Sequence, residues 1–149
     1  MRQIILDKIV STLQPLDFVL ALWQGGSAAH GYTDEWSDLD IAVVVADNCV
    51  EQAFEIVEKT IAEIGEIELK YRVQEPAWHG QSQCFWWLKE TPPFLLIDFA
   101  VFRRSSRNEF LEIERQGQGA SSVGAKHDRR KYGMITNNLY AVMLRPLQK

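Results

Sequence analysis

The sequence is poor in the features that mark secreted, zinc-binding or membrane proteins. It holds two cysteines, Cys49 and Cys84, which lie far apart and form no CxxC pair. No cluster of cysteine and histidine has the spacing of zinc ligands, so we expect no structural zinc. The longest apolar runs, residues 18–23 and 41–46, are far too short to cross a bilayer.

An excess of positive charge is also missing. Lys and Arg number 16 against 20 Asp and Glu, which gives a net charge of -4. Proteins that grip long nucleic acids through phosphate carry the opposite balance, so a long nucleic-acid partner is not expected. Asp7 and Lys8 interrupt the apolar N-terminal stretch. We therefore expect no secretory signal, no membrane partner and a cytoplasmic location.

What the sequence does contain is the composition of a folded domain. Its 149 residues are 46% hydrophobic and 24% charged, without repeats, heptads or an internal linker. Helical periodicity predicts helices over residues 4–13, 50–64 and 134–144, and a short helix could begin in 25–30. Apolar, β-branched or alternating runs predict strands over residues 17–24, 38–46, 67–73, 84–88 and 94–102. This interleaving predicts a single α/β (α+β) domain with a mixed β-sheet flanked by helices.

Asp38 and Asp40 form the first candidate site. Positions two apart in a strand point to the same face, so their carboxylates project together while Leu39 and Ile41 enter the core. The apolar run follows the acids, which places them at the start of the strand. Two carboxylates this close repel each other, and a divalent cation removes that penalty. Oxygen-only ligands favour Mg²⁺ or Mn²⁺, although an Asp-x-Asp pair alone is also common at solvated strand ends.

Asp98 adds a third acid to this pattern. It interrupts the otherwise apolar strand predicted over residues 94–102. An unpaired carboxylate there costs several kcal/mol, so it needs a cation. A distant Arg or Lys could supply the charge, but we favour a metal ion shared with the Asp38 and Asp40 pair.

The third candidate is the Gly25-Gly26-Ser27 sequence, which follows a predicted strand. Backbone N–H groups at such a junction can cradle phosphate, and glycine lets the phosphate approach closely. A plain tight turn would also explain two glycines. The sequence is no P-loop, because the required lysine is missing.

Together these residues resemble the DNA polymerase beta-like nucleotidyltransferase superfamily. Its signature is a strand, Gly-Ser or Gly-Gly, about a dozen residues, Asp-hydrophobic-Asp, and a third acid on a later strand. The matching positions here are Gly26-Ser27, Asp38-Leu39-Asp40 and Asp98. The resemblance covers about residues 17–104, which would be the catalytic core, with residues 105–149 as a C-terminal tail.

The resemblance implies a role for each of these positions. Asp38, Asp40 and Asp98 would be catalytic and would bind two Mg²⁺ ions, with Mn²⁺ as the alternative metal. Asp98 would also help remove the proton of the attacking hydroxyl. The segment Gly25, Gly26 and Ser27 would bind the nucleotide's phosphates.

The implied function is metal-dependent transfer of an NMP, with AMP from ATP preferred, onto a hydroxyl of a small molecule or protein, releasing pyrophosphate. The alternative is a weak or inactive nucleotide-binding or partner-binding module of the same fold, such as the antitoxin-like half of a two-protein pair. The partners expected are a nucleoside triphosphate and an unidentified hydroxyl acceptor. Because little chain lies outside the presumed catalytic unit, a homodimer or a separate helical protein would complete the acceptor site.

Overall fold

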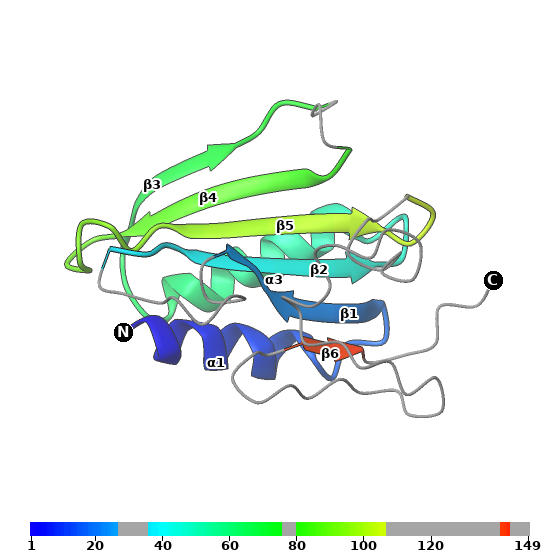
Figure 1. Ribbon diagram of the computed structural model, residues 1–149, viewed down its shortest axis with the longest axis horizontal. Helices are drawn as coiled ribbons and strands as arrows, with labels where there is room; N and C mark the ends of the chain where they lie inside the picture. Colours follow the sequence, from blue (N-terminus) through cyan, green and yellow to red (C-terminus); the bar gives the residue numbers. More distant parts are fainter. Residues whose placement is uncertain (27–35, 76–79, 107–140, 144–149) are drawn as a thin grey trace.

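A computed structural model describes residues 1–26, 36–75 and 80–106, together with the backbone of one further strand in the C-terminal part (Figure 1). The elements are, in chain order, α1 (Arg2–Leu13), β1 (Val19–Gln24), β2 (Leu39–Val45), α3 (Val50–Ala62), β3 (Ile67–Arg72), β4 (Ser82–Leu88), β5 (Ile97–Arg103) and β6 (Ala141–Met143). The six strands form one sheet in the order β3-β4-β5-β2-β1-β6. The pair β2 and β5 is parallel and the other pairs are antiparallel, so the predicted mixed sheet with helices is confirmed.

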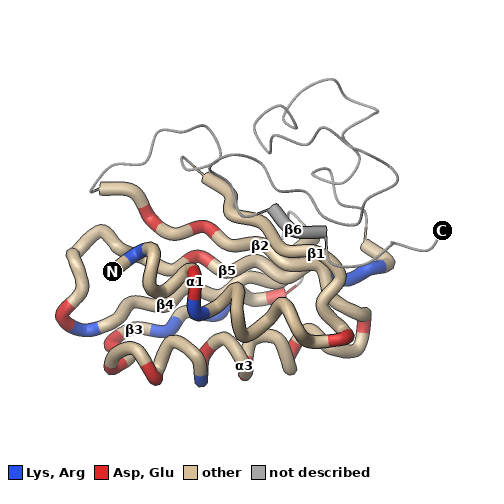
Figure 2. The backbone as a smooth tube through the Cα atoms, turned by 90° about the horizontal axis from the view of Figure 1, so that it is seen from below, with Lys and Arg blue, Asp and Glu red and all other residues tan. Residues whose placement is uncertain are grey.

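Helices α1 and α3 lie on the same face of the sheet (Figure 2). Helix α1 buries Ile5, Ile9 and Leu13 and helix α3 buries Val57 and Ile61, at the spacing of a single helical face. This face meets the inward side chains of strands β1, β2, β4 and β5. The described helices therefore leave the opposite face of the sheet open to other functions.

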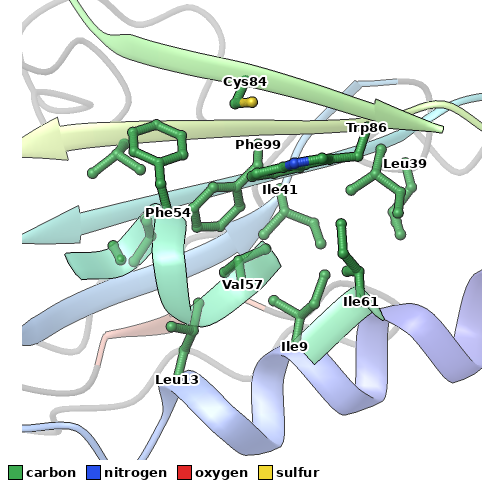
Figure 3. Packing of buried hydrophobic residues seen from close by; sticks show 14 of the residues in the cluster. Ile9, Leu13, Leu39, Ile41, Phe54, Val57, Ile61, Cys84, Trp86 and Phe99 are labelled. Atoms are coloured by element: carbon green, nitrogen blue, oxygen red, sulfur yellow. The ribbon is translucent and has the colours of Figure 1, made fainter. Parts of the chain in front are cut away.

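Aromatic rings fill the centre of the helix-side core (Figure 3). Phe54 of α3 meets the edge of Phe99 at a centroid distance of 5.7 Å, and Trp86 lies 6.1 Å from Phe99. Trp86 and Phe99 are both fully buried. Beside them, burial raises the pKa of the Cys84 thiol to about 11, so this thiol stays protonated.

The opposite face of the sheet carries a smaller apolar cluster. Trp23 of β1 stacks on Phe102 of β5 at 5.8 Å, and Ala42 of β2 and Ala100 of β5 belong to the same cluster. A register shift between Val19 and Ala21 changes which side chains of β1 face each way. Because the side chains of Ala42 and Ala100 are small, they leave space above this part of the sheet, next to the site described below.

Strand β3 is partly or fully exposed on both of its faces. Its charged side chains lie toward α3, where Lys70 forms an ion pair with Glu58 and Arg72 forms one with Glu51 at 2.8 Å. The less polar side chains, Leu69 and Tyr71, are 44% and 59% exposed on the other face. The charged face thus lies against the acidic flank of α3, since β3 is the edge strand next to that helix.

Two sequence-based predictions are wrong in detail. The helix expected over residues 134–144 is contradicted where the chain is described, because Ala141–Met143 is strand β6 and pairs with β1. Backbone hydrogen bonds to the free edge of β1 outweigh the helical periodicity there. Strand β5 begins at Ile97 and not at 94, because residues 92–96, which start with two prolines, form tight turns. The short helix expected in 25–30 lies mostly outside the described residues.

In the described part of the chain, no helix is both long and apolar enough to cross a membrane.

Candidate active site

Asp38 and Asp40 lie where strand β2 begins. Asp38 directly precedes the strand and is exposed, and Asp40 is its second residue and is partly buried. The flanking Leu39 and Ile41 are buried in the helix-side core. Asp40 therefore points to the opposite face of the sheet, because side chains alternate along a strand.

Asp98 occupies the equivalent place on the neighbouring strand. In the parallel register of β2 and β5, Asp40 is the partner of Asp98. Neighbouring strands lie about 4.8 Å apart, and partners in register project from the same face. Ile97 and Phe99 on either side of Asp98 are buried against the helices. The structure thus brings together the three acids that the sequence singled out.

The environment of Asp40 disfavours its negative charge. The pKa of this carboxyl is raised from 3.8 to about 7, first by burial and then by the charges of Asp38 and Asp98. Hydrogen bonds from Asp40 to the other two carboxyls favour the protonated form further. Near neutral pH the cluster is therefore poised to bind either a proton or a cation.

The chemistry of the three carboxylates fits a divalent metal ion. Carboxylate oxygens are the ligands that Mg²⁺ and Mn²⁺ prefer, and an ion would relieve the repulsion that raises the pKa of Asp40. Among the described residues, no three Asp, Glu, His or Cys side chains converge on one ion-sized point. Binding an ion through Asp38, Asp40 and Asp98 therefore requires their side chains to turn from hydrogen-bonding to one another.

The two described glycines of the predicted phosphate segment pack directly on Asp40. The Gly25 N–H donates to the Asp40 backbone oxygen at 3.0 Å, which extends the pairing of β1 with β2. Gly26 has a φ of +61°, and a Cβ there would lie 1.7 Å from the Asp40 Oδ2. Any side chain at this position would collide with the carboxylate. Both this close contact and the positive φ therefore require glycine at residue 26. Ser27 lies outside the described residues.

Gln83 of strand β4 completes the described surroundings of the acids. Its Nε2 donates to the Asp98 Oδ1 at 2.6 Å. This contact orients the Asp98 carboxylate from the side of strand β4. Sequence reasoning missed Gln83 because it lies just before the strand expected over 84–88. Side chains alternate between the two faces of a strand. Extending the predicted strand back by one residue would therefore have placed Gln83 on the acidic face, opposite Cys84.

A small cavity lies over these residues. Its volume is about 130 Å³, and Gly26, Asp40, Gln83 and Asp98 are among the side chains and backbone that line it. The stacked Trp23 and Phe102 pair forms its apolar wall. Sites for whole drug-sized ligands enclose about 300–1,000 Å³, so the described walls fit one part of a ligand, such as a phosphate group.

The chain also matches a known family of protein domains. The family model of the nucleotidyltransferase domain matches residues 4–93, which include Gly25, Gly26, Asp38 and Asp40. Asp98 lies beyond the matched segment, so its place beside the pair comes from the β2–β5 register. A search of curated proteins gave no match. The match spans more than half of the chain and includes the first two acids, and on this basis the protein belongs to the nucleotidyltransferase domain family.

Proposed function

We propose that the protein transfers the AMP part of ATP onto a hydroxyl group and releases pyrophosphate, with a divalent metal ion as cofactor. Membership of the family supports nucleotidyl transfer in general. The observation that carries the proposal furthest is the position of Asp40, between Asp38 and Asp98 and against the glycine turn. This arrangement gathers negative charge where a cation and a triphosphate would meet.

In the reaction, the acceptor oxygen attacks the α-phosphorus and forms a new P–O bond. The bond from that phosphorus to the oxygen bridging the α- and β-phosphates breaks, and pyrophosphate leaves with the electron pair. Asp98 accepts the proton of the attacking hydroxyl, and the Gln83 contact orients its carboxylate for this step. The turn at Gly25 and Gly26, which packs directly on Asp40, orients the phosphates beside the acids.

Mg²⁺ held by Asp38, Asp40 and Asp98 would neutralise charge that builds up on the phosphate oxygens, and Mn²⁺ could replace it. Two ions are proposed because the resemblance to the nucleotidyltransferase superfamily implies them, with Asp38, Asp40 and Asp98 as their ligands. Positioning and neutralisation are the main contributions of such a site to the rate of phosphoryl-type transfer.

The test uses ATP, GTP, CTP and UTP, each labelled at the α-phosphate, with hydroxyl acceptors and either Mg²⁺ or a chelator. We expect label to move from ATP to the acceptor only with metal present. Asp40→Asn and Asp98→Asn should each lower the rate at least about 100-fold, because each removes a ligand or the proton acceptor. Asp7→Asn, on the exposed side of α1, is the matched control and should behave as wild type.

Transfer at the wild-type rate by Asp98→Asn would refute the role given to that residue. Metal-dependent binding of ATP without transfer to any acceptor would instead support a binding module of the same fold. The acceptor, and the second copy or helical protein expected to complete its site, stay predictions. Size-exclusion chromatography with light scattering would show whether the protein forms a dimer.

A further inference from the structure

The acids form one half of a row that crosses four strands on the same face of the sheet. Asp40 of β2 is in register with Asp98 of β5, Asp98 with Phe85 of β4, and Phe85 with Tyr71 of β3. Partners in register project from the same face, so the row runs perpendicular to the strands over roughly 14 Å. Along this row, the carboxylates of Asp40 and Asp98 are followed directly by the aromatic rings of Phe85 and Tyr71.

The aromatic half of this row is accessible. Tyr71 is 59% exposed and Phe85 is partly buried, and their rings stack at a centroid distance of 6.3 Å with an interplanar angle of 25°. One step along the strands, Leu69 and Trp87 are also partners in register and extend the apolar surface. The charged side chains of β3 lie on the other face, where Lys70 pairs with α3. We call Tyr71 and Phe85 the aromatic platform.

The platform lies on the side of the acids away from the glycine turn. Strand β1, which Gly25 and Gly26 follow, borders β2, whereas β4 and β3 lie beyond β5. In an in-line displacement, the attacking oxygen and the leaving group lie on opposite sides of the phosphorus. Phosphates at the glycine turn direct the leaving pyrophosphate to that side, and the acceptor then approaches Asp98 from the side of Phe85.

We propose that the aromatic platform is the acceptor site, and that the acceptor is a small molecule whose hydroxyl is carried on or next to a ring. This rests on the function proposed above. A flat apolar ring face stacks on Phe85 and Tyr71, while its hydroxyl reaches Asp98 one strand away. The acceptor O–P bond forms as the bond to pyrophosphate breaks, and the proton passes to Asp98. A highly charged acceptor would lack partners on this apolar surface.

The experiment compares ring-bearing and open-chain acceptors at saturating ATP and Mg²⁺. Benzyl alcohol and methyl β-D-glucoside represent aromatic and sugar rings, and n-butanol and glycerol are their open-chain counterparts. We expect kcat/KM to be about tenfold higher for at least one ring-bearing acceptor than for its counterpart. Tyr71→Ala and Phe85→Ala should abolish that preference by raising the KM of the ring-bearing acceptor. The KM of ATP should not change, and Tyr71→Phe should retain the preference.

Phe94→Ala is the matched aromatic control, because Phe94 is 47% exposed and contacts Trp36 away from the platform. Binding of the same four compounds, followed by ligand-observed NMR with and without ATP and Mg²⁺, decides the question even without turnover. Loss of ring binding in Phe85→Ala and Tyr71→Ala, but not in Phe94→Ala, supports the platform. Equal binding by all variants, or no preference for rings, overturns it.

The failure of the proposed function has a different signature. In that case ATP and Mg²⁺ fail to stabilise the protein and no label is transferred, whatever the ring compounds do at the platform. If the nucleotide is bound and transferred but the platform variants behave as wild type, only the acceptor site is refuted.

Discussion

Asp40 is the residue at which stability and proposed activity conflict. Its carboxylate is partly buried against Gly26 and lies beside two other acids. A protein selected only for stability would place a neutral side chain here, because the ionised form repels its neighbours. The cost of keeping an acid at this position is the physical sign that the site serves a ligand.

This conflict gives a stability prediction for Asp40→Asn in metal-free buffer. A pKa raised from 3.8 to about 7 means that the folded protein holds this proton more tightly than the unfolded chain does. The resulting stabilisation is complete below the unfolded pKa and is lost as pH rises through the folded value. Above pH 7 the ionised Asp40 destabilises the fold, and asparagine cannot ionise.

We therefore expect Asp40→Asn to be more stable than wild type at about pH 8, by about 1–2 kcal/mol after allowing for partial solvent screening. The gap should shrink toward about pH 4. Thermal melts across this pH range measure it, with Asp7→Asn as the control variant. A constant difference between Asp40→Asn and wild type at all pH values would show that repulsion is not the cause.

At the scale of the element, strand β4 lies next to β5 and contacts the acidic site from there. Its alternation sends Cys84 and Trp86 into the helix-side core and Gln83 and Phe85 to the acidic face. The same strand therefore anchors the sheet with one set of side chains and contacts Asp98 with the other. Variation on the acidic face of β4 should change the chemistry without unfolding the protein.

Gln83→Ala tests this division. Loss of the Nε2 contact frees the Asp98 carboxylate to rotate away from the position in which it accepts the proton, and small misplacements of a reacting group lower the rate. We expect kcat to fall about tenfold or more, with the KM of ATP and the melting temperature nearly unchanged. Gln52→Ala, at an exposed position of α3, is the control. A changed KM of ATP with an unchanged kcat would contradict a positioning role for Gln83.

The elements that the sequence predicted well have strong local signals. The β-branched run after Asp40 identifies β2, and the apolar run over residues 84–88 identifies most of β4. Strand β6 has no such signal, because its three residues become a strand only by pairing with β1. The Gln83 contact also depends on a partner from another strand, so no spacing rule within the sequence indicates it.

The acidic site falls between these cases. The spacing of Asp38 and Asp40 places both at one strand end, and the apolar surroundings of Asp98 mark it as unusual. That the third acid meets the first two depends on the register of β2 with β5, which the sequence does not state. Similarly, the two faces of β3 could not be assigned without knowing that the acidic flank of α3 lies on one side.

At the scale of the whole molecule, binding of a divalent ion should stabilise the folded chain. An ion that binds only the folded state stabilises it by about 1.4 kcal/mol at a tenfold excess over Kd. We expect Mg²⁺ to raise the melting temperature of wild type at about pH 8, less at about pH 5, where protons compete for Asp40. Asp40→Asn should lose most of this increase, and a chelator should reverse it. An equal increase in both proteins would place the ion elsewhere.

The parallel pairing of β2 with β5 has one more consequence. Between these strands the chain makes α3, β3 and β4, so β5 reaches β2 only by a long return. Docking β5 beside β2 is also the event that forces Asp98 against Asp40. The pairing that joins the two halves of the sheet therefore also assembles the acidic cluster, so a variant that weakens the β2–β5 pairing would separate Asp98 from Asp40 as well.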